Sequence, residues 1–80
     1  MSTISAEKFG QICDDVWRDR AGILSRRGVL SDEDALVRAV YWRIRKAGGE
    51  PDRNIASHST LLAELVRRCR DEAAQVCQGL

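Results

Sequence analysis

Three cysteines and one histidine are the residues of this chain best suited to bind a metal ion. Zinc sites usually contain a close ligand pair such as C-x2-C or H-x3-H, and the sequence has neither. Two of the cysteines are eight residues apart in a predicted helix, about 12 Å along its axis, which is too far for one ion or a disulfide. All three fall on apolar helix faces, where cysteine behaves as a small hydrophobic residue. We therefore predict no metal site and no cofactor at Cys13, His58, Cys69 and Cys77.

Nucleophilic catalysis is not indicated either. His58 stands between Ser57 and Ser59, which is an ordinary environment for the start of a helix. No phosphate-binding loop, dinucleotide motif, H-E-x-x-H or nucleophile elbow is present. We predict that the chain is not an enzyme.

An acidic cluster near the start of the chain is the next candidate. Asp14, Asp15 and Asp19 lie on one side of a predicted helix, and carboxylates in such a group can bind a divalent cation. Arg18 lies between them and can pair with Asp14 or Asp15. We predict a solvated, self-compensated face rather than a cation site.

Trp42 is the least expected residue, because the polar face of a predicted helix surrounds it with cations. Arg38 lies four residues before it, Arg45 three after and Lys46 four after, so all three are its neighbours on the helix surface. Tryptophan and arginine are enriched among the residues that anchor protein interfaces. We predict a partner-binding patch of Arg38, Trp42, Arg45 and Lys46. The alternative is that the ring packs under another helix or under the arginine side chains.

Nucleic-acid binding is the second functional hypothesis. Arginine-rich stretches occur on two predicted helices, but a helix–turn–helix needs a connection of three or four residues and here the connection has about ten. The 13 basic and 12 acidic residues also give no strong positive field. The residues that would carry this alternative are Arg43, Arg67, Arg68 and Arg70.

These candidates depend on a central helix predicted at about 32–47. Ser31 is a suitable N-cap, and three acids at 32–34 lie where the positive end of the helix dipole favours them. Gly48 can end the helix and Pro51 prevents its continuation. The apolar positions predicted to face the core are Leu36, Val37, Val40, Tyr41, Ile44 and Ala47.

Two further amphipathic helices are predicted, at about 5–26 and 58–78, with a possible break in the first near Gly22. Arg20 projects from the apolar stripe of the first. It either extends its guanidinium to the edge, pairs with a carboxylate of another helix, or follows the end of the helix. The non-periodic segment 48–57 is predicted to be a loop with a short turn.

Helices with one apolar face each must bury those faces against one another. We predict one all-α domain over residues 1–80, a compact three-helix bundle or four short helices if the first breaks. No transmembrane segment or signal peptide is apparent, so we expect a cytoplasmic protein without membrane contact. Surplus apolar surface makes a homodimer plausible. The predicted function is that of a small non-catalytic protein-interaction module.

Overall fold

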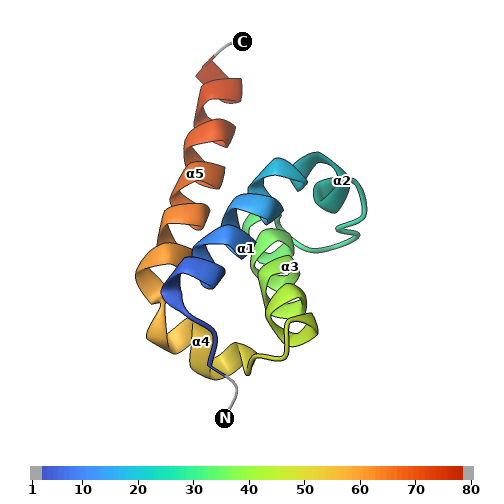
Figure 1. The fold of residues 1–80 in the computed structure, drawn as a ribbon. Coiled ribbons are helices and arrows are strands. Elements are labelled where there is room, and N and C mark those ends of the chain that lie inside the picture. The colour runs from blue at the N-terminus through green and yellow to red at the C-terminus, as the bar shows by residue number, and fades with distance from the viewer. Residues whose placement is uncertain (1–2, 79–80) are drawn as a thin grey trace.

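The computed structural model describes residues 3–78, and the side chains of residues 3–75. This part of the chain is helical, contains no strand and confirms the predicted all-α class. It forms five helices where three or four were predicted (Figure 1). They are α1 (Ala6–Arg18), α2 (Arg20–Ser25), α3 (Asp32–Lys46), α4 (Pro51–Ser57) and α5 (Ser59–Gln78).

Helix α3 is the centre of the arrangement, because each of the other four helices packs against it. The Ser31 hydroxyl accepts a hydrogen bond from the backbone N–H of Asp34 and so caps its first turn. Gly48 follows the helix with φ of +86°, a left-handed conformation that a residue with a Cβ rarely adopts. These local signals set both ends of α3 within one residue of the predicted range.

The helix predicted at 5–26 is divided, and the break lies at Asp19 rather than at Gly22. Asp19 has φ of −96° and ψ of 11°, while Gly22 lies inside α2. Contacts with other helices hold this bend. The Asp19 carboxylate pairs with Arg43 of α3 at 3.1 Å, and Arg20 pairs with Glu72 of α5 at 2.8 Å. The break therefore follows tertiary contacts and not the local preference of glycine.

Helix α4 occupies the segment that was predicted to be a loop. Pro51 starts it at the first helical position, where its missing N–H costs nothing. Asn54 is fully buried; its side chain accepts from the backbone N–H of Ile4 at 2.9 Å and donates to the Glu50 carbonyl at 2.8 Å. The helix is seven residues long and has no apolar period, so these contacts replace the amphipathic pattern that marks the longer helices.

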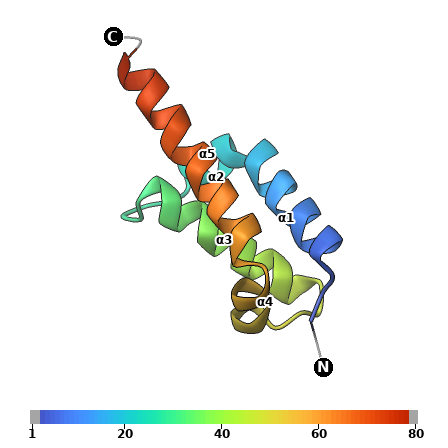
Figure 2. The ribbon, with the colours of Figure 1, turned by 90° about the vertical axis from the view of Figure 1, so that its left-hand side faces the viewer.

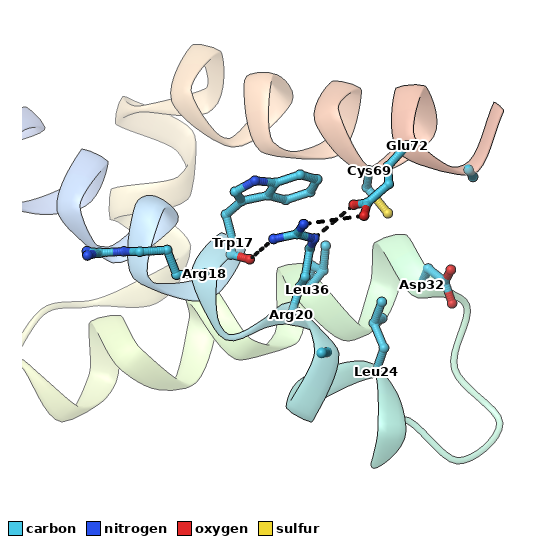
Figure 3. Close-up of a pocket in the computed structure, with 10 residues that line it drawn as sticks. Trp17, Arg18, Arg20, Leu24, Asp32, Leu36, Cys69 and Glu72 are labelled. Carbon is cyan, nitrogen blue, oxygen red and sulfur yellow. Dashed lines mark hydrogen bonds and ion pairs between the residues drawn. The ribbon is translucent and has the colours of Figure 1, made fainter. Parts of the chain in front are cut away.

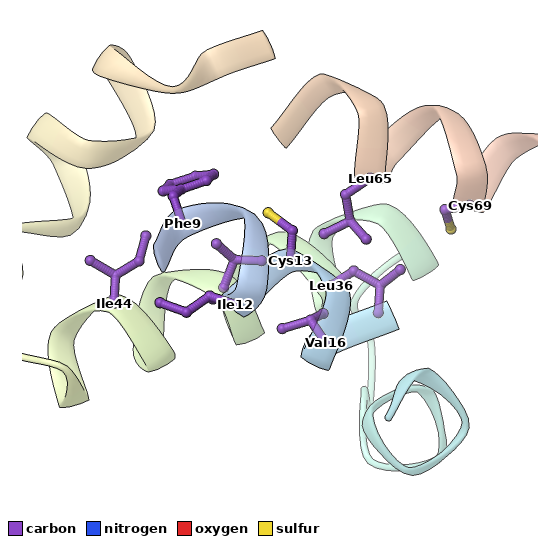
Figure 4. Packing of buried hydrophobic residues seen from close by; sticks show 9 residues of the cluster. Phe9, Ile12, Cys13, Val16, Leu36, Ile44, Leu65 and Cys69 are labelled. Atoms are coloured by element: carbon purple, nitrogen blue, oxygen red, sulfur yellow. The ribbon is translucent and has the colours of Figure 1, made fainter. Parts of the chain in front are cut away.

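The core lies where α1, α3 and α5 meet (Figure 4). Each of these helices contributes the apolar stripe seen in its sequence, as expected for amphipathic helices that bury one face. The apolar side chains that the shorter helices α2 and α4 add, such as Ile23 and Ile55, are only half-buried. The buried cluster consists of Phe9, Ile12, Cys13, Val16, Leu36, Val40, Ile44, Leu65 and Cys69.

The C-terminal turns of α5 extend beyond the other helices in both views (Figures 1 and 2). The helix has 20 residues and the molecule measures 48 × 23 × 17 Å along its principal axes. Cys77 lies in these turns, and its side chain falls outside the described residues, so the prediction made for it is not addressed by the structure.

Candidate functional site

Four residues on the outward face of α3, Arg38, Trp42, Arg45 and Lys46, are named here the Trp42 surface. The Trp42 side chain is 52% exposed, although tryptophan is usually well covered. The Arg45 guanidinium carbon lies 5.7 Å from the centroid of the indole ring, within the range of a cation–π contact. Helix α3 therefore presents its indole to solvent among cations.

A cavity of about 370 Å³ opens beside Trp42. Leu30, Val37 and Tyr41 provide most of its apolar wall, and Tyr41 meets the Trp42 ring edge-on with the centroids 6.0 Å apart. Asp34 and Arg38 lie at its edge. The sequence had placed Val37 and Tyr41 on the core face of α3, but both are only half-buried, and Ala47 from the same predicted face is exposed.

The true core face of α3 is narrower than the apolar pattern indicated. Leu36, Val40 and Ile44 are buried to within about one percent of complete coverage. Val37 and Tyr41 lie one step around the helix, where they are half-buried and line the cavity beside Trp42. An amphipathic stripe on a helix cannot tell how far the neighbours extend around it, which is why the sequence missed the cavity.

The cations of the Trp42 surface have no acidic partner in the described part of the chain. Neither Arg38, Arg45 nor Lys46 forms an ion pair there, and the contact of Arg45 with the indole is the one specific interaction of the three. Asp34 lies four residues before Arg38 and is also without an ion pair among the described residues. The hydrogen-bonding groups of this surface are therefore left to solvent.

The four arginines of the nucleic-acid hypothesis are in the opposite situation, because each of them meets an aspartate or glutamate of its own chain. Arg67 lowers the pKa of Glu64 through a direct hydrogen bond. Glu33 in the same way raises the pKa of Arg70. The pairs are Arg43 with Asp19 at 3.1 Å, Arg67 with Glu64 and with Asp71 at 2.8 Å, Arg68 with Asp14 at 3.6 Å, and Arg70 with Glu33 at 2.6 Å.

Arg20 lies in a cavity of about 710 Å³ between α1, α2, α3 and α5 (Figure 3). Its guanidinium carbon lies 4.2 Å from the centroid of the Trp17 ring, and one of its terminal nitrogens donates to the Trp17 carbonyl at 2.8 Å. Two other nitrogens donate to the Glu72 carboxylate at 2.8 and 3.3 Å. Two of the three outcomes considered from the sequence occur: α1 ends before Arg20, and Arg20 pairs with a carboxylate of another helix. Its side chain therefore links α2 to both α1 and α5.

The thiols are placed as core residues. Cys13 and Cys69 are 7% exposed and free. Burial raises the pKa of the Cys13 thiol to about 11, with a smaller contribution from the charge of Asp14. Burial also raises the pKa of Cys69. Both are therefore protonated near neutral pH, a form that is a poor nucleophile and a poor metal ligand.

His58 takes part in fixing the N-terminal segment. Its Nε2 lies 3.2 Å from the Ile4 carbonyl oxygen, and its ring contacts Phe9 with the centroids 5.1 Å apart. Among the side chains of residues 3–75, no group of three His, Cys, Asp or Glu residues is arranged to hold a metal ion. The aspartates of the acidic cluster each pair with an arginine: Asp14 with Arg68, Asp15 with Arg18 and Asp19 with Arg43.

Comparisons with protein families, with characterised proteins and with solved structures gave no match to this chain. None of the helices in the described residues has the length and apolar character needed to cross a membrane.

Proposed function

We propose that this chain is a non-catalytic protein-interaction module that binds its partner through the Trp42 surface. One observation carries the proposal: a half-exposed indole lies among three cations without carboxylates in the described chain, beside an apolar cavity. A surface of this composition has the aromatic and arginine content that is typical of the energetic centre of an interface.

The binding mode follows from the exposed apolar area and the hydrogen-bond donors that these residues do not use within the described chain. Trp42 provides a large apolar area with few rotatable bonds, so covering it costs little conformational entropy. The guanidiniums of Arg38 and Arg45 retain their donors, which can bind a partner carboxylate in a bidentate manner. The cavity next to the indole could take one apolar side chain of the partner.

The nucleic-acid hypothesis has less support. Its arginines would have to exchange their carboxylates for phosphates, and the carboxylates left behind would repel the nucleic acid. A titration with mixed-sequence DNA and RNA at two salt concentrations decides between the classes. Tight binding that weakens steeply with salt would favour nucleic acid and overturn the proposal.

The direct experiment compares partner capture by three forms of the chain. Immobilised wild type, Trp42→Ala and Lys8→Ala are exposed to native extract, and the captured proteins are quantified. Lys8 is a matched control, because it is an exposed cation on α1 with no ion pair among the described residues. We expect Lys8→Ala to capture as wild type and Trp42→Ala to lose about thirtyfold in affinity, the effect of an interface anchor. Equal capture by all three forms would contradict the proposal.

A further inference from the structure

We propose that the partner of the Trp42 surface is a second copy of the same chain, bound with the two α3 helices antiparallel about a two-fold axis. This inference rests on the proposed function and adds the identity of the partner. It follows from the order of charges along the exposed face of α3, which is complementary to itself when reversed.

The charges at the two ends of this face are opposite. Asp34 lies in the first turn of α3 and Arg45 in the last, and both are exposed. They are eleven residues apart, about 17 Å along the helix, and differ by only about 20° around it. Neither forms an ion pair within the described chain, so each is available to a residue of another molecule.

When the two-fold axis passes beside the midpoint between Ala39 and Val40, it brings Asp34 and Arg45 of different copies together. Positions equally distant from the axis face one another in an antiparallel pair, so Asp34 of one copy lies opposite Arg45 of the partner subunit. Symmetry creates this pair twice. The antiparallel arrangement also opposes the two helix dipoles, which is favourable.

In the same register Arg38 lies near the two-fold axis, about 4.5 Å along the helix from the partner's Arg38. Arg38 faces Tyr41 of the partner subunit and lies close to the partner's Trp42, so a guanidinium meets aromatic rings. Lys46 lies further around the helix, at the edge of the contact, where it keeps its hydration. The two Asp34–Arg45 pairs and these ring contacts therefore act against the repulsion between the two Arg38 side chains.

The apolar part of the surface gains coverage in the same contact. Trp42 and Val29 are the exposed large apolar side chains of the described chain, at 52% and 103%. Val29 precedes Leu30, which lines the cavity beside Trp42 with Val37. A second α3 laid across this face covers the cavity and the indole together, and the apolar area removed from water favours association.

The dimer is tested by reversing the charge of Asp34 or of Arg45 and by mixing the two variants. Sedimentation of the wild type between micromolar and submillimolar concentrations is expected to show a concentration-dependent dimer. Asp34→Arg and Arg45→Asp each replace two attractive pairs with two repulsive ones, and each alone is expected to weaken the dimer at least tenfold. An equimolar mixture of the two variants restores both pairs in a heterodimer, so the mixture should sediment as a dimer although neither component does.

Lys8→Glu serves as the control, because it reverses a charge on α1 away from this face and should dimerise as the wild type. A small loss of stability in either single variant does not affect the conclusion of the mixing experiment, because both variants are present in the mixture that is expected to dimerise. A wild type that stays monomeric, or a mixture that does not recover, overturns the inference. The capture experiment with Trp42→Ala then still decides whether the surface binds a different protein.

Discussion

Helices α3 and α5 both carry clusters of arginine, but the two clusters have different surroundings. On α5, Arg67, Arg68 and Arg70 each meet a carboxylate within 3.6 Å. On the outer face of α3, Arg38 and Arg45 meet none in the described chain. The number of cations in a stretch therefore says little about binding, whereas their pairing with carboxylates decides which cluster is available to a partner.

Cys13 belongs to the core, where α1 packs against α5. Titration of its thiol should cause the largest change in the free energy of unfolding. Because burial raises the pKa of Cys13 from 9.0 to about 11, the folded state holds this proton more tightly than the unfolded chain. The stabilisation is complete below pH 9 and is lost as the pH rises from 9 to 11, by about 2–3 kcal/mol.

The measurement is the free energy of unfolding of wild type and Cys13→Ala at pH 8 and pH 11. The wild type should lose more stability than the variant over this range, and the difference isolates the thiol from the other groups that titrate. Parallel losses in both proteins would mean that the Cys13 thiolate is solvated, and that this side of the molecule is more open than the structure indicates.

Arg20 and Arg38 differ in their partners and should therefore differ in their contribution to stability. Arg20 bonds to Glu72 and to the Trp17 carbonyl, so Arg20→Ala should lower the free energy of unfolding by about 1–3 kcal/mol. Arg38 has no such bonds in the described chain, and Arg38→Ala should change it by no more than about 0.5 kcal/mol. Urea unfolding of both variants gives the two values, and equal losses would remove the distinction between the two regions.

A smaller effect is expected at the exposed pairs of α5. Arg70 bonds to Glu33 of α3 with 69% of its side chain exposed, so Arg70→Ala should lower the free energy of unfolding less than Arg20→Ala does, and less still at high salt. Arg45→Ala should show neither the loss nor the salt dependence. A salt-dependent loss at Arg45 would reveal an acidic partner within its own chain and break the comparison.

Local signals in the sequence were sufficient for α3 and for most of the core. Ser31, the acids after it and Gly48 define the helix, and positions such as Leu36 and Ile44 follow from its period. These features depend on residues within a few turns of one another.

The features that were missed depend on residues far apart in the chain. Helix α4 is held by Asn54, which bonds to Ile4 fifty residues earlier, and no short-range pattern announces it. The partner of Arg20 is 52 residues away, and that of Arg70 is 37 residues away. The pairing of Arg20 and of Arg70 is therefore a property of the tertiary structure, whereas Arg67 is paired by Glu64 and Asp71 of its own helix.

The most direct test of the Trp42 surface is the free energy of unfolding of Trp42→Ala, measured at a protein concentration low enough to exclude association. An indole that faces solvent contributes little to the folding of its own chain, so we expect a change within about 1 kcal/mol of wild type. A loss of about 3–5 kcal/mol is the cost of removing a buried tryptophan. That result would place Trp42 in the core and contradict the account.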